Sequence, residues 1–238
     1  MTELGVHFSH RDPGPGEAAW LAVIEAARLP ALVPDASPTL VVAPHPDDET
    51  LGAGGLIATL LAAGARVEVL CLTDGEAPSG VPDLALARRR RGERGGAMAH
   101  LGVEGVTSLG LPDGELSNLG EGTLVGAIGD ALGGSRRCVG PFAGDGHPDH
   151  AATGEACRRV CASREVELLS YPIWAWHWSE ARADGFLRGG RILPLGPDEA
   201  LRKRRAIGAY ASQTSGDDPI IGSRVLAHFT RSFEVFLA

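Results

Sequence analysis

Lysine is nearly absent from this chain, and its scarcity narrows the chemistry that the chain can carry. Lys203 is the single lysine, against 21 arginines. The lysine of a phosphate-binding loop, or one that forms a Schiff base, would have to be this residue. No glycine-rich loop precedes it, and it stands in a charged helical stretch. The sequence therefore argues against both of these site types.

The chain also lacks a strong positive charge and long apolar runs. Its net charge of −8 argues against nucleic acid as the main partner, and the basic run of four arginines at residues 88–91 is typical of a solvated helix face. No stretch of about twenty apolar residues is present, so we expect no membrane span. Residues 1–7 lack the basic and apolar regions of a secretory signal. We therefore expect a cytoplasmic protein.

Cysteines are few and scattered. The four are Cys71, Cys138, Cys157 and Cys161. The last two are one helical turn apart and could touch, but buried free thiols are commoner than a disulfide or a metal site in this setting. We expect all four to be free.

The 238 residues are enough for one domain with a full hydrophobic core. Residues 1–37 are proline-rich and indicate an N-terminal extension that wraps the domain, with a helix over 15–27. Residues 38–175 form a core in which apolar runs alternate with amphipathic segments, and residues 176–238 add C-terminal elements. No internal repeat interrupts this organisation.

The alternation in the core predicts a sheet of buried strands with a helix after each strand. The expected strands are 40–43, 67–72, 106–109, 137–142 and 166–173, and the expected helices are 50–63, 84–101, 121–132 and 150–162. Strands that are apolar throughout are typical of parallel sheets covered on both faces. The fold class is therefore α/β: Rossmann-like and mainly parallel, with a further C-terminal helix over 197–210 and a late edge strand over 231–237.

Two clusters of histidine and acidic residues follow strands of this sheet. Residues 44–49 read Pro-His-Pro-Asp-Asp-Glu, and residues 144–150 read Gly-Asp-Gly-His-Pro-Asp-His. In open α/β sheets, loops at the carboxyl ends of the strands meet where the strand order reverses. Imidazole nitrogens and carboxylate oxygens are the donors that zinc takes. Their donor residues are His45, Asp47, Asp48, Glu49, Asp145, His147, Asp149 and His150.

Other interpretations of these clusters are weaker. An aspartate in such a loop often caps the helix that follows, and either cluster alone could serve that purpose. The two together, each after a strand, favour a metal centre. Residues 52–55, Gly-Ala-Gly-Gly, lack the spacing of a dinucleotide-binding loop. Small residues there more simply let the helix approach the sheet.

With these motifs the chain resembles the PIG-L/LmbE-like family of zinc-dependent de-N-acetylases. The first motif stands at residues 44–49 and the second, His-x-x-His, at residues 147–150. Three further segments are similar: 73–76 (Thr-Asp-Gly-Glu), 90–93 (Arg-x-x-Glu) and 109–114 (Leu-Gly-Leu-Pro-Asp-Gly). The likeness extends over residues 38–215, and the paired motifs are highly specific.

The resemblance implies how the metal centre is built. Its zinc ligands would be His45, Asp48 and His150, and Asp47 would be the general base that deprotonates the metal-bound water. The chemistry of the residues alone also places two histidines and a carboxylate on the metal. It does not choose between the two adjacent aspartates.

The resemblance also implies roles for residues around the metal. His147, oriented by Asp149, would polarise the oxyanion or protonate the leaving amine. Arg90 and Asp113 fall where the family contacts its sugar-like substrate.

Three of the four tryptophans lie in residues 170–178. In an extended conformation Trp174, Trp176 and Trp178 would share one face, which suits stacking on a sugar or an aromatic group. Packing beneath a C-terminal helix is the alternative. His177 is expected at the same end of the sheet as the metal motifs, and is a secondary candidate for substrate binding.

The motifs and the resemblance together predict a zinc-dependent hydrolase that removes an acyl group, expected to be acetyl, from an amino-sugar-like small molecule. An amidase of a thiol conjugate is an alternative on the same fold. A metal-dependent phosphoesterase or a nucleotide-binding module is a further alternative, although two-metal phosphoesterases need more bridging carboxylates than these loops supply. The sequence leaves open whether the chain forms a homo-oligomer.

Overall fold

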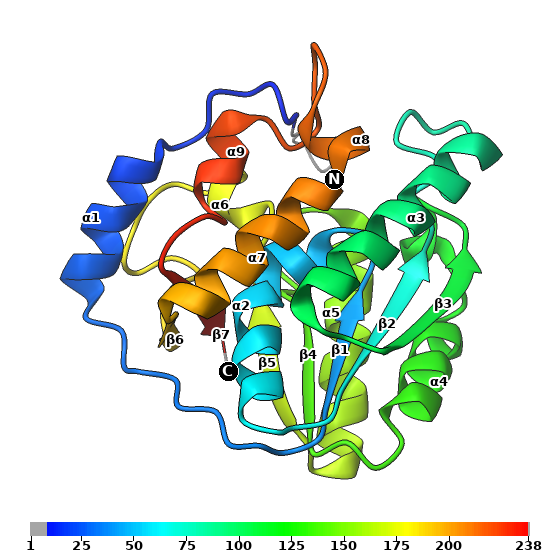
Figure 1. The fold of residues 1–238 in the computed structure, drawn as a ribbon, viewed down its shortest axis with the longest axis horizontal. Coiled ribbons are helices and arrows are strands. Elements are labelled where there is room, and N and C mark those ends of the chain that lie inside the picture. The colour runs from blue at the N-terminus through cyan, green and yellow to red at the C-terminus, as the bar shows by residue number, and fades with distance from the viewer. Residues whose placement is uncertain (1–8, 238) are drawn as a thin grey trace, which may run out of the picture.

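A seven-stranded sheet runs through the centre of the molecule in the order β3-β2-β1-β4-β5-β7-β6 (Figure 1). The computed structural model describes residues 9–237. The expectations for residues 1–7, that they carry no secretory signal and begin an N-terminal extension, lie outside the described residues.

Five strands of the sheet are parallel: β1 (Thr39–Ala43), β2 (Val67–Thr73), β3 (Gly105–Leu111), β4 (Arg137–Pro141) and β5 (Glu167–Tyr171). Every residue of β1 and β4 is buried, as expected for strands covered on both faces. The predicted fold class is confirmed, and each predicted core strand lies within two residues of its observed position.

The C-terminal strands differ from the prediction. β7 (Phe233–Leu237) was expected at an edge, but it lies between β5 and β6 (Gly190–Pro194) and is antiparallel to both. The edge assignment was wrong because β6, which the sequence did not reveal, occupies that edge. Ala31 in turn pairs with Ile192 of β6, which ties the N-terminal segment to the same edge.

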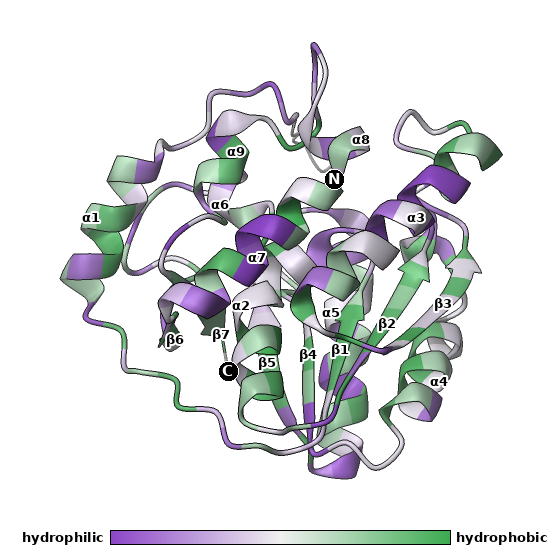
Figure 2. Ribbon diagram, in the orientation of Figure 1, coloured by the Kyte–Doolittle hydropathy of each residue, from purple (hydrophilic) through white to green (hydrophobic). Residues whose placement is uncertain are grey.

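Helices cover both faces of the sheet. In Figure 1, α2 (Asp48–Ala62), α3 (Leu84–Leu101) and α7 (Pro197–Ala209) lie in front, whereas α4 (Glu121–Leu132) and α5 (Pro148–Arg164) lie behind. Two separate hydrophobic clusters fill the spaces between the sheet and these layers. Figure 2 shows the strands mostly green, with purple on the outward sides of α3 and α7.

The remaining elements are short or peripheral: α1 (Glu17–Ala27), η1 (Leu116–Asn118), α6 (Ala175–Trp178), α8 (Ala211–Thr214) and α9 (Ser223–Ala227). The extended conformation considered for the tryptophan segment is wrong, because residues 175–178 form α6. Trp174, just before α6, stacks on Trp178 with ring centroids 4.9 Å apart, whereas Trp176 turns away to pack on Trp20.

All four cysteines are free and buried, as predicted. Among residues 9–237, no helix combines the length and the apolar character needed to cross a membrane.

Candidate metal centre

The two acidic-histidine motifs meet at the point where the strand order reverses. β1 lies between β2 and β4, so the loops that leave the carboxyl ends of β1 and β4 are adjacent. The first loop leads into α2 at Asp48, and the second leads into α5 at Pro148. This is the meeting place expected from the sequence.

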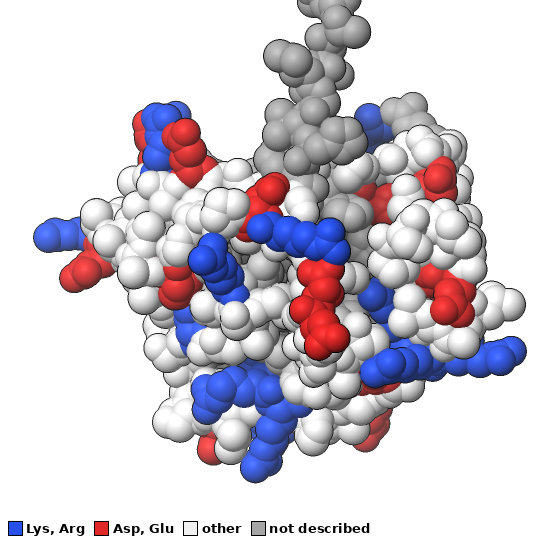
Figure 3. Space-filling view, turned by 90° about the horizontal axis from the view of Figure 1, so that it is seen from above, with Lys and Arg blue, Asp and Glu red and all other residues white. Residues whose placement is uncertain are grey.

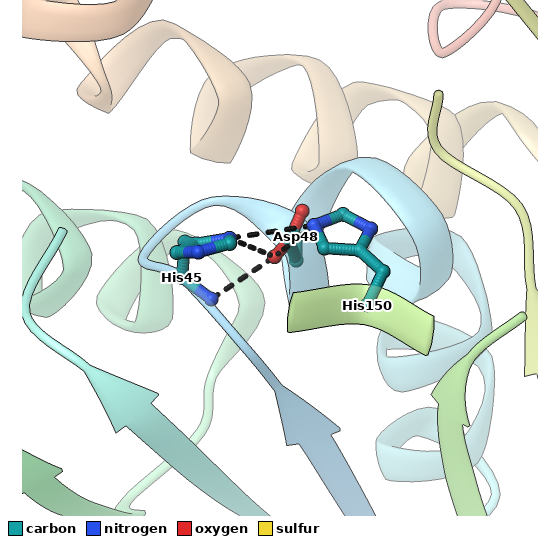
Figure 4. Close-up of side chains that lie close together, drawn as sticks. All are labelled: His45, Asp48 and His150. Atoms are coloured by element: carbon teal, nitrogen blue, oxygen red, sulfur yellow. Dashed lines mark hydrogen bonds and ion pairs between the residues drawn. The ribbon is translucent and has the colours of Figure 1, made fainter. Parts of the chain in front are cut away.

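Three ligand atoms from these loops lie almost equidistant from one another. Asp48 Oδ2 is 3.2 Å from His45 Nδ1 and 3.3 Å from His150 Nε2, and the two nitrogens are 3.3 Å apart (Figure 4). Tetrahedral ligands of zinc, each about 2.0–2.2 Å from the ion, are separated by about 3.3–3.6 Å. The spacing and the donor types therefore fit a zinc ion.

The other nitrogen of each imidazole faces a carboxylate. His150 Nδ1 lies 2.7 Å from Asp145 Oδ2, and His45 Nε2 lies 3.2 Å from both Asp149 Oδ2 and Asp113 Oδ1. Metal-binding histidines commonly donate their second N–H to a carboxylate, which fixes the tautomer. The arrangement leaves His150 Nε2 and His45 Nδ1 free to bind the ion.

Asp145 has a role here that the sequence did not single out. Its buried carboxylate accepts the backbone N–H groups of Ile173, Trp174 and Ala175 as well as facing the imidazole of His150. The residue thus joins the loop after β4, α5 and the start of α6. Its only sequence signal is an acidic residue between two glycines just before the histidine motif.

A second group of potential metal ligands shares the imidazole of His45 with the first. Its carboxylates are better explained as groups that orient this imidazole. The second group consists of His45 with Asp113 and Asp149. The carboxylate of Asp149 accepts two backbone N–H groups, from Gly114 and Leu116, and that of Asp113 accepts one from Ala77. These bonds orient both carboxylates toward the imidazole.

The adjacent aspartates have opposite electrostatic environments. Burial raises the pKa of Asp47 well above its ordinary value, and the charge of Asp48 raises it further. Burial acts the same way on Asp48, but the charge and hydrogen bond of His150, together with those of His45, lower its pKa far below the usual range. Asp48 is therefore ionised, whereas Asp47 readily holds a proton.

His147 lies beside the three ligands without joining them. Its ring centroid is 4.7 Å from that of His150, and its Nδ1 accepts the backbone N–H of Asp149 at 3.2 Å. We expected Asp149 to orient His147. Its carboxylate faces His45 instead, and it is the backbone N–H of Asp149 that contacts His147. Burial and the charges of the neighbouring histidines lower the pKa of His147 to about 4, so the ring is neutral with its hydrogen on Nε2.

A cavity of about 340 Å³ opens beside these residues, within the range of small-molecule sites. Arg90 and Asp113 line it, in the region expected to contact substrate. Arg90 is buried and donates from Nη1 to Gly75 O at 2.6 Å, while its Nε has no partner among the described residues.

His177, the secondary candidate for substrate binding, does not line this cavity. The turn of α6 directs its ring toward Trp174 and the backbone near Gly14, where it is 2% exposed.

Charges of both signs are mixed on the face seen from above in Figure 3. The described residues of that face present no continuous field of one sign.

Comparisons with known proteins agree with the arrangement of the fold and motifs. The family model described as GlcNAc-PI de-N-acetylase (PIG-L) matches residues 40–161. The chain is 30% identical over 169 residues to a 1D-myo-inositol 2-acetamido-2-deoxy-alpha-D-glucopyranoside deacetylase of Mycobacteroides abscessus, a match that covers 59% of each chain. It is 31% identical over 137 residues to a probable N-acetyl-alpha-D-glucosaminyl L-malate deacetylase of Bacillus subtilis, covering 54% of this chain and 62% of the relative.

Among solved structures, the conserved protein TT1542 of Thermus thermophilus superposes with a TM-score of 0.65 at 26% identity. The match covers 85% of this chain and 94% of that one. The chain spans 59% of the length of the mycobacterial relative, and therefore less than two thirds of it.

Proposed function

The chain belongs to the GlcNAc-PI de-N-acetylase (PIG-L) family, and from this premise we propose that it is a zinc-dependent hydrolase that removes the N-acetyl group of a sugar-like small molecule. The observation that carries the proposal is the triangle of ligand atoms from His45, Asp48 and His150, with sides of 3.2–3.3 Å, at the edge of the cavity. A bound zinc ion would polarise the amide carbonyl and lower the pKa of a water molecule.

Asp47 is the general base in this proposal. It lines the cavity next to the metal ligand Asp48, and its raised pKa suits a group that takes a proton and returns it. The proton leaves the water whose oxygen attacks the amide carbon. It then passes from Asp47 to the nitrogen as the carbon–nitrogen bond breaks, so the products are the free amine and acetate.

His147 stabilises the oxyanion as a neutral donor. Its Nδ1 is occupied by the backbone N–H of Asp149, which leaves the Nε2 hydrogen available for the developing charge. A neutral ring with a pKa of about 4 has no proton to spare for the amine, so protonation of the leaving group falls to Asp47.

Arg90 and Asp113 contact the sugar in this proposal. Both line the cavity, and their side chains offer a donor and an acceptor that suit hydroxyl groups. His177 is left out because it does not line the cavity.

The test is release of primary amine by zinc-loaded protein from a panel of N-acetyl amino sugars and their glycosides. A matching set of phosphate monoesters tests the phosphoesterase alternative. We expect amine and acetate in equal amounts and no phosphate. Phosphate release without amine release would refute the proposal.

A further inference from the structure

The cavity has an apolar lining that the chemistry proposed above does not use. Its members are Ile173, Trp174, Trp178, Ile220 and Ile221. Neither amide hydrolysis nor the binding of sugar hydroxyl groups requires these side chains.

The five side chains form one surface. Three belong to a single buried hydrophobic cluster, and Trp178 and Ile220 pack against that cluster. The rings of Trp174 and Trp178 stack with an interplanar angle of 15°, and the backbone N–H of Trp174 is held by Asp145. We call these five residues the apolar wall. Asp145 contacts both the wall and the imidazole of a metal ligand, so the wall is fixed relative to the metal centre.

The apolar wall lies outside the part of the chain that is shared with the family model. The match ends at residue 161, and all five members follow it in the sequence. The metal end of the cavity, in contrast, comes from residues within the match. The mycobacterial and Bacillus relatives are named for inositol and malate glycosides, whose aglycones are polar. A polar aglycone would lose hydration against tryptophan and isoleucine without gaining hydrogen bonds there.

We propose that the substrate carries an apolar group that binds against the apolar wall. This inference rests on the proposed function and names the substrate class: an N-acyl amino sugar with a hydrophobic substituent. Two parts of such a substrate can carry the apolar group: an aromatic or alkyl aglycone, or a long acyl chain. Burial of either against aromatic and aliphatic side chains removes apolar area from water.

The experiment compares two matched pairs of substrates on zinc-loaded protein. The first pair is the phenyl and methyl glycosides of N-acetylglucosamine, and the second is N-octanoyl- and N-acetylglucosamine. We expect at least about a tenfold higher kcat/KM for the apolar member of one pair. A preference for phenyl assigns the group to the aglycone, and a preference for octanoyl assigns it to the acyl chain.

A second measurement does not depend on turnover. Two of the four tryptophans line the cavity, so their emission should respond to a ligand on the apolar wall. Phenyl and methyl glucosaminides, which have no acyl group to lose, and octanoate and acetate are titrated against the protein. The apolar member of the preferred pair should bind at least about tenfold more tightly.

Ile220→Asn tests whether the apolar wall causes the preference, because Ile220 is only partly buried and its replacement disturbs the core less than a change at a buried member of the wall. Val33→Asn is the control, since Val33 is 85% exposed and does not line the cavity. The first variant should reduce the preference to about threefold or less, and the control should keep it.

The outcomes separate this inference from the proposed function. Amine release with no preference in kinetics or binding overturns the apolar wall as a specificity element and leaves the deacetylase intact. Selective binding of an apolar ligand without any amine release overturns the deacetylase and leaves the wall as a binding site. If the protein neither binds these ligands nor releases amine, both the apolar wall as a binding site and the proposed deacetylase are overturned.

Discussion

The backbone N–H of Asp47 donates to the Oε2 of Glu49 at 3.3 Å, and Asp47 has a φ of +129°. A residue with a side chain is strained at such a value, by about 1–3 kcal/mol, and keeps it only when its surroundings enforce it. The other oxygen of Glu49 accepts the hydroxyl groups of Tyr210 and Thr50. The end of α7 therefore supports the residue that fixes the backbone of the proposed base.

The first prediction is that Tyr210→Phe lowers kcat about tenfold and leaves zinc content unchanged. Without the hydroxyl, Glu49 loses one of its donors and holds Asp47 less firmly, and a small displacement of a catalytic group is costly. Elemental analysis and steady-state kinetics measure the two quantities.

Tyr171→Phe is the matched control for that variant. Tyr171 is the only other tyrosine, is equally buried, and donates to Val42 O instead of to Glu49. It should reduce stability without a comparable loss of kcat. Equal losses of kcat in both variants would show that general loosening is the cause.

The second prediction separates the adjacent aspartates. Asp47→Asn should keep zinc and lower kcat about 10²–10⁴-fold, because a general base contributes about that much. Asp48→Asn should lose both zinc and activity, since it removes the charged ligand. If Asp47→Asn also loses the metal, the division of roles between the two residues is wrong.

The residues of the candidate metal centre could be brought together from the sequence because short motifs encode them. His45, Asp48 and His150 lie at fixed places directly after strands, and the switch point of a parallel sheet brings such places together. Helix limits were also predictable where local signals are strong. α3 ends at Leu101 because Gly102 adopts a φ of +87°, which suits glycine at a helix terminus.

Other features depended on contacts between distant segments. Alternating tryptophans look like a strand, yet the backbone N–H groups at the start of α6 bind Asp145, 28–30 residues earlier, and favour a turn of helix. The carboxylate of Asp149 could have faced either neighbouring histidine, and only the folded chain directs it to His45. β6 was missed because its five residues, Gly190–Pro194, contain a glycine and a proline that are atypical of strands.

The third prediction concerns His147. His147→Ala should retain zinc and lower kcat about 10²–10³-fold, the effect of losing one oxyanion donor. Its pKa of about 4 means that the ring is already neutral well below pH 7, so it should contribute no alkaline limb to the rate profile. The raised pKa of Asp47 should instead set an acidic limb, with activity rising as Asp47 loses its proton. An alkaline limb that disappears in His147→Ala would show that the protonated ring is the active form.

The fourth prediction tests whether the carboxylate of Asp145 supports the imidazole of His150, a proposed metal ligand. Asp145→Asn should weaken zinc binding about 10–100-fold, because the amide no longer offers a charged acceptor to His150 Nδ1. The measurement is competition for zinc with a chelator of known affinity. Asp184→Asn is the control, since Asp184 is an exposed aspartate that pairs with Arg182. An unchanged zinc affinity in Asp145→Asn would mean that the carboxylate serves only the backbone of α6.

The last prediction concerns how α1 is attached to the domain. Glu17, at the start of α1, accepts from Arg231 Nε and Nη2 at 2.7 Å and lies 2.6 Å from His228 Nδ1. Burial raises the pKa of Glu17, but the hydrogen bonds from Arg231 and His228 outweigh it and lower the pKa overall. A carboxyl group with a lowered pKa in the folded state stabilises the fold above its unfolded pKa of about 4.3, and the contribution disappears as the pH falls.

Glu17→Gln should therefore reduce the free energy of unfolding at pH 7 by about 1.5–3 kcal/mol, the range for hydrogen bonds to charged groups. Glu155→Gln is the matched control, because Glu155 also binds arginine nitrogens, two of Arg158 and one of Arg159, but its side chain is 39% exposed against 23% for Glu17. The control should change stability by less than about 1 kcal/mol. Urea unfolding at several pH values measures both variants. The difference between wild type and Glu17→Gln should narrow below about pH 4, since protonated Glu17 resembles glutamine. A gap that stays constant down to about pH 3 would show that packing of α1, and not the charge of Glu17, holds the helix in place.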